Sequence, residues 1–226
     1  VEVEAEPRHA AIIVKQLGLW KLSNAVTTPG VKQTSFDPGA SLEGEAATLY
    51  RSLVMRASYL AEDRPDIKYA VKDAARFMHA PCELGMELLK RIGRYLLGRP
   101  RLVQVFSRQR WSGVLKGFSD SDHAGCLETR KSTSCGVFMI GDHMLKVFSA
   151  TQGSEALSSG ESEWYALVHT ASRGIGMVSL AKDMGYDLEL VLAGDATAAS
   201  GIAHRRGDGR IRHIETKTLW LQCHVT

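Results

Sequence analysis

Apolar residues in the first half of the chain recur at the spacing of amphipathic helices. In the first such stretch Leu49, Leu53, Ala57 and Leu60 are separated by four, four and three positions. Prolines at positions 65 and 81 restart the pattern twice, and Gly98 and Pro100 end it. The pattern therefore predicts three consecutive helices in a small helical subdomain. Ahead of them we expect one helix over Ala10 to Leu17 and otherwise extended or loose chain.

After Trp111 the apolar positions begin to alternate, as in strands. The pattern predicts a first strand ending near Ser121, then two strands, Thr133 to Ile140 and Met144 to Ala150, joined as a hairpin. Turn residues Gly141 and Asp142 separate the two members of the hairpin. We expect these three strands to form an antiparallel meander.

A long helix is predicted after the meander, because Ser158-x-x-Glu161 is a capping-box pattern. A fourth strand follows and ends at Gly194-Asp195. Two further helices are expected, one over Ala196 to His204 and one along the apolar stripe from Ile211 through Ile214 to Val225. The order βββαβα, then α, predicts an α/β fold with a mixed sheet.

Composition narrows the class of protein. The chain has 226 residues, of which 44% are hydrophobic, enough for one large domain or two small ones. No run of eighteen apolar residues and no basic-then-apolar leader occur, so we expect an intracellular protein without a membrane partner. The four cysteines form no Cys-x-x-Cys pair, which argues against a zinc ribbon and a disulfide framework.

The net charge of +3 conceals a basic strip, which we define as Lys90, Arg91, Arg94, Arg99 and Arg101. Arg108 and Arg110 continue it, and no acid occurs between Leu88 and Trp111. Clustered cations of this kind are typical of surfaces that bind nucleic-acid phosphates. A solvated helix face followed by a basic linker is the alternative interpretation.

Three acids occupy positions at which their side chains could meet. Asp120 lies on the first strand, Glu161 in the first turn of the long helix, and Asp195 at the end of the fourth strand. If strands one and four are neighbours and the helix packs across them, the three carboxylates converge. Hard oxygen donors suit two Mg²⁺ or Mn²⁺ ions, which activate water for phosphodiester hydrolysis. Taken singly, Glu161 could be only a capping residue and Asp195 only a helix N-cap.

Several motifs resemble one family. Gly117-Phe-Ser-Asp-Ser-Asp-His-Ala-Gly125, the segment Thr129 to Ser134, and Ala156-Leu-Ser-Ser-Gly-Glu-Ser-Glu-Trp-Tyr-Ala-Leu167 resemble the ribonuclease H domain of copia-type LTR retrotransposon polyproteins. Independently, Arg64-Pro-Asp-Ile-Lys-Tyr-Ala-Val71 is similar to the helical segment that joins reverse transcriptase to ribonuclease H in the same polyproteins.

The resemblance implies three regions. Residues 1–44 would be the tail of the reverse transcriptase palm region, 45–110 a helical thumb- or connection-like segment, and 111–226 a ribonuclease H-like domain that lacks its fifth strand. The implied activity is metal-dependent cleavage of the RNA strand of RNA/DNA hybrids.

By position, the implied catalytic and metal-binding acids are Asp120, Glu161 and Asp195, with two Mg²⁺ (or Mn²⁺) ions as cofactors. Implied partners are the hybrid and the remainder of the Pol polyprotein, including reverse transcriptase and integrase. The implied location is a cytoplasmic particle or the nucleus.

The sequence also departs from the family pattern. His123 stands where tryptophan is common, and Gly160 and Ser162 replace the usual Thr and Ala. The family's fourth metal-site acid, after a fifth strand, and the Tyr-x-Asp-Asp motif of the polymerase do not occur. A catalytically inactive nucleic-acid-binding remnant is therefore the alternative function, and a helical protein-interaction segment a third.

The sequence leaves four further polar residues without an assigned role. Asp122 could rival Asp120 as a metal ligand, and Glu215 has the position of a helix-start residue. His204 and His213 could be proton shuttles or surface histidines.

Overall fold

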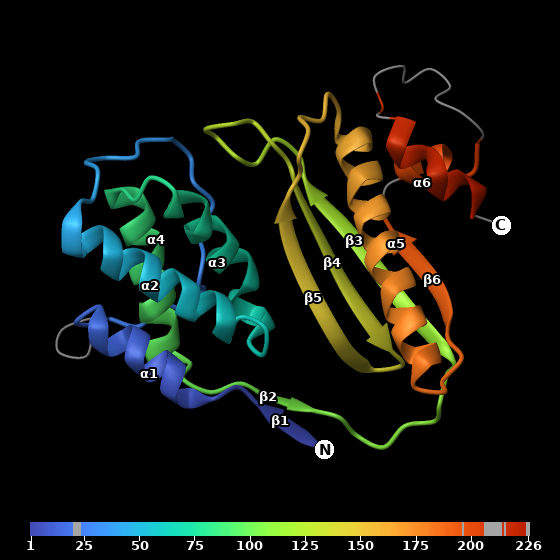
Figure 1. Cartoon of the computed structure of the whole chain (residues 1–226), viewed down its shortest axis with the longest axis horizontal. Helices are drawn as coiled ribbons and strands as arrows, with labels where there is room; N and C mark the ends of the chain where they lie inside the picture. The colour runs from blue at the N-terminus through green and yellow to red at the C-terminus, as the bar shows by residue number, and fades with distance from the viewer. Residues whose placement is uncertain (20–23, 196, 206–213, 215, 225–226) are drawn as a thin grey trace. The chain divides into compact units, whose positions relative to one another are not determined.

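The computed structural model describes residues 1–19, 24–195, 197–205, 214 and 216–224, and these divide into two compact units, Val1–Ser107 and Arg108–Thr226 (Figure 1). His213, Glu215 and the predicted helix positions Ile211 and Val225 lie outside the described residues. Each unit has its own hydrophobic core.

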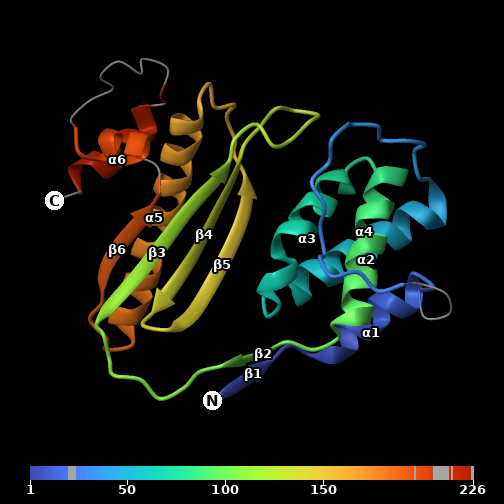
Figure 2. The same ribbon diagram turned by 180° about the vertical axis from the view of Figure 1, so that it is seen from behind.

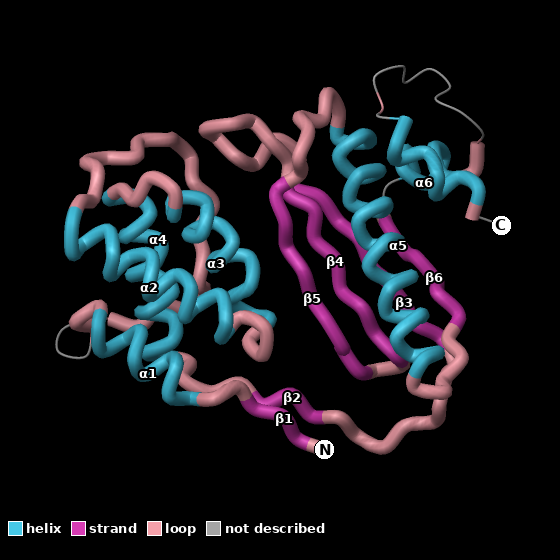
Figure 3. Tube along the Cα trace, in the orientation of Figure 1, coloured by secondary structure: helices cyan, strands magenta, loops and turns pink. Residues whose placement is uncertain are grey.

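The first unit is helical (Figure 3). Its helices are α1 (Pro7–Gln16), α2 (Gly44–Leu60), α3 (Lys68–Ala75) and α4 (Glu83–Gly98), with 3₁₀ turns at Pro65–Ile67 and Arg76–Met78 on either side of α3. The three predicted helices are thus confirmed. A short antiparallel pair, β1 (Glu2–Glu4) with β2 (Val103–Val105), joins residues about a hundred positions apart. The first 44 residues are not separate, because Ile13 of α1 lies in the same core as Leu53.

A buried arginine fixes the corner between α2 and α3. Arg64 is 1% exposed, and its guanidinium donates through Nε and Nη2 to the two carboxylate oxygens of Asp66 at 3.0 and 2.8 Å. It also donates to the backbone carbonyls of Arg99 and Pro100, and Tyr95 Oη donates to Asp66 at 2.8 Å. We call these groups the Arg64 network. In this network the guanidinium is paired with a carboxylate and two carbonyl oxygens, and the carboxylate also accepts from a hydroxyl.

The second unit is built on a four-stranded mixed sheet with the order β5-β4-β3-β6, seen from behind in Figure 2. Its strands are β3 (Val114–Asp122), β4 (Thr133–Ile140), β5 (His143–Thr151) and β6 (Glu189–Gly194). The β3–β4–β5 meander is antiparallel and β6 runs parallel to β3. The predicted meander is confirmed, and the first and fourth strands are neighbours, which is the condition for the three acids to converge.

Helix α5 (Ser159–Asp183) lies across one face of this sheet (Figures 1 and 2). Alternate residues of β3 point toward it, with Leu115 fully buried beside Phe138. At Gly174 an added Cβ would come within 2.7 Å of Leu190, so the absence of a side chain lets the helix approach β6 closely. The helix therefore has a fixed position over the two strands that carry the predicted acids.

The remaining described segments pack on α5. They are α6 (Thr197–Ala203) and a 3₁₀ helix, η3 (Thr216–Cys223), where the sequence predicted an α-helix. The fully buried Trp164 donates from Nε1 to Thr218 Oγ1 at 2.9 Å. In the part of the chain that the structure describes, no helix combines the length and apolarity needed to cross a membrane.

Candidate metal centre

Three elements of the second unit meet at one end of the sheet: the C-terminal end of β3, the C-terminal end of β6 and the first turns of α5 (Figure 1). Asp120, Glu163 and Asp195 come from these elements, and one carboxylate oxygen of each lies within 4.8 Å of the others. Asp120 and Asp195 are exposed and Glu163 is half-buried. We call these three residues the carboxylate cluster.

The predicted convergence holds for Asp120 and Asp195, but the helix acid that joins them is Glu163 and not Glu161. Glu161 is 2% exposed, and both of its carboxylate oxygens are engaged. Oε2 accepts from the backbone N–H of Leu157 at 2.7 Å, and Oε1 accepts from the Tyr165 hydroxyl at 2.8 Å. Ser158 completes the cap by accepting from the Glu161 N–H. Glu161 therefore caps the start of α5, as in the alternative interpretation of the sequence. Because its carboxylate is used in this cap, it does not meet Asp120 and Asp195.

The capping box contained the signal that separates the two glutamates. Residues two apart on a helix point in directions about 200° apart, so Glu161 and Glu163 cannot face the same strand. Once Glu161 is assigned to the cap, Glu163 is the acid left to face β3.

Glu163 is oriented by Ser121 on β3. Its Oε1 accepts from the Ser121 hydroxyl at 2.8 Å and from the Ser121 backbone N–H at 3.3 Å. The pKa of Glu163 is raised, first by burial, against the bonds from Ser121 that lower it, and further by the charges of Asp120 and Asp195. None of the ion pairs between the described residues involves the carboxylate cluster.

The donor atoms of the carboxylate cluster suit a hard divalent cation. All are carboxylate oxygens, and neither a histidine nor a cysteine belongs to the described group. Oxygen-only sites select Mg²⁺, Ca²⁺ or Mn²⁺ over zinc and copper. The residues present therefore fit the ions that the sequence predicted.

Asp122 and His204 do not belong to the carboxylate cluster. Asp122 turns back over its own loop, where an added Cβ at Gly125 would collide with its carboxylate oxygen Oδ2. His204, beyond α6, is exposed and its Nδ1 lies 2.9 Å from the backbone oxygen of Ser200.

The basic strip belongs to the first unit, and the structure gives several of its members intramolecular partners. Arg91 donates to Thr28 Oγ1 at 2.9 Å, and Arg94 donates to the backbone oxygen of Asn24 at 2.7 Å. Arg101 donates from two nitrogens to the Glu4 carboxylate at 2.6 and 2.7 Å. Lys90 and Arg99, in contrast to Arg91 and Arg94, are exposed.

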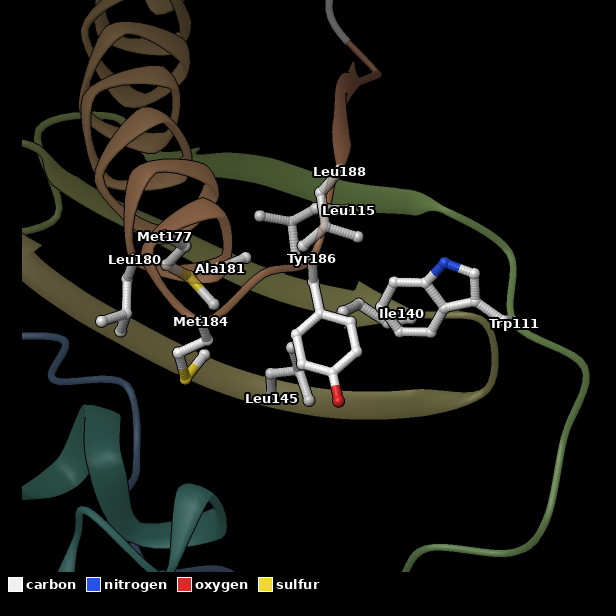
Figure 4. Close-up of a pocket in the computed structure, with 10 residues that line it drawn as sticks. All are labelled: Trp111, Leu115, Ile140, Leu145, Met177, Leu180, Ala181, Met184, Tyr186 and Leu188. Carbon is white, nitrogen blue, oxygen red and sulfur yellow. The ribbon is translucent and has the colours of Figure 1, made fainter.

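A cavity of about 430 Å³ lies at the opposite end of the sheet from the carboxylate cluster (Figure 4). The end of α5 and the first residues of β3 and β6 form its apolar wall. Trp111 and Tyr186 lie at one side, their ring centroids 5.5 Å apart. No carboxylate or cation lines it.

Similarity to known proteins identifies the class. The chain is 34% identical over 163 residues to the retrovirus-related Pol polyprotein from transposon RE1 of Arabidopsis thaliana, covering 72% of this chain and 11% of that protein. It is 33% identical over 141 residues to the corresponding polyprotein from transposon RE2, with 62% and 10% covered. The secreted RxLR effector protein 161 of Plasmopara viticola is 35% identical over 127 residues, 56% of this chain and 89% of the effector.

The matches to the two transposons show that this class of protein is a segment of a larger Pol polyprotein. The chain belongs to the retrovirus-related Pol polyproteins of copia-type transposons. It spans about a tenth of the length of the Pol relatives that it matches. No protein-family model matches the chain, and neither does any solved structure.

Proposed function

We propose that the unit Arg108–Thr226 has a ribonuclease H-like fold and hydrolyses the RNA strand of RNA/DNA hybrids with divalent metal ions. The observation that carries the proposal is the carboxylate cluster of Asp120, Glu163 and Asp195. The strand order, a meander followed by a helix and a parallel strand, and the kinship with Pol polyproteins support it. Glu163 replaces Glu161 in the catalytic set.

Each part of the cluster has a distinct task in this proposal. Asp120 and Asp195 present exposed carboxylates on two neighbouring parallel strands, where a nucleic-acid backbone could reach them. Glu163 adds a third oxygen donor from the helix, with its direction set by Ser121. When bound, two Mg²⁺ or Mn²⁺ ions would supply a nucleophilic water and stabilise the leaving oxygen. The protein contributes position and charge, so no covalent nucleophile is needed.

The test is hydrolysis of a labelled RNA/DNA hybrid in Mg²⁺ by the whole chain and three variants. We expect Asp195→Asn and Glu163→Gln to lower the rate by about a hundredfold or more, because each removes an oxygen ligand. Asp187→Asn is the matched control, because this exposed aspartate follows α5 at the far end of the sheet. Equal rates for Asp195→Asn and the parent would refute the assignment.

A catalytically inactive hybrid-binding remnant is the second candidate. It is favoured by the exposed Lys90 and Arg99 of the basic strip. It predicts binding that weakens steeply with salt, without metal-dependent cleavage by the parent chain. The hydrolysis experiment, run with a binding measurement on the same hybrid, separates the two functions.

A further inference from the structure

Behind the carboxylate cluster lies a set of buried hydroxyl and amide groups. Ser162 and Ser134 are fully buried, and Gln152 is 3% exposed. Burying polar groups of this kind lowers the stability of the fold unless they form hydrogen bonds, so their bonding partners are informative. Their bonds lead from the interior to one carboxylate of the cluster.

The chain of contacts begins at Gln152, just after β5. Its Nε2 donates to the Ser162 carbonyl at 2.8 Å and to Ser134 Oγ at 3.0 Å. The Ser162 hydroxyl lies 2.8 Å from Ser121 Oγ, and Ser121 Oγ lies 2.8 Å from Glu163 Oε1. The start of α5 is thereby tied to both β3 and the end of β5.

Counting hydrogens fixes the direction of this chain. A serine hydroxyl has one hydrogen, and when Glu163 is ionised the hydrogen of Ser121 is donated to it. Ser121 then has no hydrogen left for Ser162, so any bond between the two hydroxyls has Ser162 as its donor. The Ser159 carbonyl, 2.8 Å from the Ser162 hydroxyl, accepts the same hydrogen and shares it with Ser121. A hydroxyl that accepts one bond and donates another is polarised, and its donated bond is strengthened.

We propose that Ser121 and Ser162 are positioning residues for a divalent cation: Ser162 holds the Ser121 hydroxyl, which in turn sets the direction of the Glu163 carboxylate. Partners that orient a ligand commonly tune metal affinity. The inference deepens the proposed function, because it rests on that function's metal site, but it does not rest on cleavage.

The test is Mn²⁺ binding to the whole chain, measured by isothermal titration calorimetry. We expect Ser121→Ala to raise the Kd for Mn²⁺ about tenfold. Ser162→Ala, one step further from the carboxylate, should raise it about threefold. Ser121→Thr keeps a hydroxyl on the strand and should retain the parent Kd.

Ser119→Ala is the matched control, because Ser119 lies on the same face of β3 and is 7% exposed, whereas the hydrogen bonds to Glu163 come from Ser121. Melting temperatures in EDTA separate positioning from stability: a purely structural serine would lower the melting temperature and leave the Kd unchanged. Ser121→Ala binding Mn²⁺ within twofold of the parent and of Ser119→Ala would overturn the proposal.

The outcomes also separate this proposal from the proposed function. A parent that binds Mn²⁺ and loses affinity in Ser121→Ala, but does not cut the hybrid, would refute hydrolysis and support the positioning role. If the parent cuts the hybrid and the serine variants keep the parent Kd for Mn²⁺, hydrolysis is supported and the positioning role is refuted. A parent that binds no Mn²⁺ would refute both.

Discussion

Charged side chains gather in two places in the molecule, and the two places treat charge in opposite ways. In the Arg64 network a buried guanidinium faces the carboxylate of Asp66 and two carbonyl oxygens. In the carboxylate cluster three acids lie within 4.8 Å of one another, and their mutual repulsion helps to raise the pKa of Glu163. The first arrangement satisfies its charges from within the chain, whereas the second accumulates one sign.

The Arg64 network is an arrangement that stabilises the fold, whereas the carboxylate cluster is the arrangement for which we propose a function. A buried ion pair with every group bonded is strongly destabilised by losing one partner. A cluster of like charges costs stability, and the cation that we propose for it would offset that cost. Removing charge should therefore have opposite consequences at the two places, and three experiments, in order of expected effect, test the comparison.

The largest effect is expected at Arg64. Arg64→Ala should lower the free energy of unfolding by about 3–5 kcal/mol, because it removes the buried guanidinium from Asp66, which keeps only its bond from Tyr95, and from two backbone carbonyls. Urea unfolding of the whole chain measures the loss. Arg101→Ala, which breaks the exposed pair with Glu4, is the control and should change stability far less. Similar losses in the two variants would remove the distinction between buried and exposed pairs.

The two glutamates of α5 give the next comparison. Glu161→Gln should cost about 1–2 kcal/mol of stability, because an amide cannot accept from both Leu157 N–H and Tyr165 O–H through two oxygens. It should leave Mn²⁺ affinity close to that of the parent. Glu163→Gln should instead weaken Mn²⁺ binding and cost little stability. Urea midpoints in EDTA and calorimetric Mn²⁺ titrations measure the two quantities, and metal loss confined to Glu161→Gln would return that residue to the catalytic set.

The smallest effect concerns pH. Because the pKa of Glu163 is raised from its ordinary value of 4.5, the folded chain binds this proton more tightly than the unfolded chain. The stability contributed by this group is therefore present below pH 4.5 and is lost as the pH rises through the raised value. Urea midpoints of the parent minus those of Glu163→Gln, measured in EDTA between about pH 4 and pH 7, should fall with pH. A difference that rises over the same window would contradict the raised pKa.

Local sequence patterns predicted the elements of the fold well. The period of two and the Gly141-Asp142 turn located the hairpin, and Gly98 marks the end of α4. Asp120 and Asp195 could be predicted to meet, because parallel neighbouring strands bring their carboxyl ends to one edge of the sheet. These features depend on residues close in sequence or on a general rule of topology.

The rest depended on contacts between distant residues. Helix periodicity gives the two directions of Glu161 and Glu163 but not which of them faces β3. The capping box indicates the answer only if Glu161 uses its carboxylate in the cap, and that depends on its contacts with Leu157 and Tyr165 in the folded chain. The basic strip similarly lacks acids nearby in sequence, yet Arg101 finds Glu4 97 positions away. The antiparallel pairing of β1 with β2 has the same origin, since three-residue strands carry almost no periodic signal.

That pairing has a consequence for modularity. Because Glu2–Glu4 lie against Val103–Val105, the chain enters and leaves the helical unit at the same place. A unit whose two ends adjoin can be inserted into a longer polypeptide, or circularly permuted, without stretching the host chain. The β1–β2 pair would thus hold the segment before α1 against the segment after α4 within a longer polypeptide.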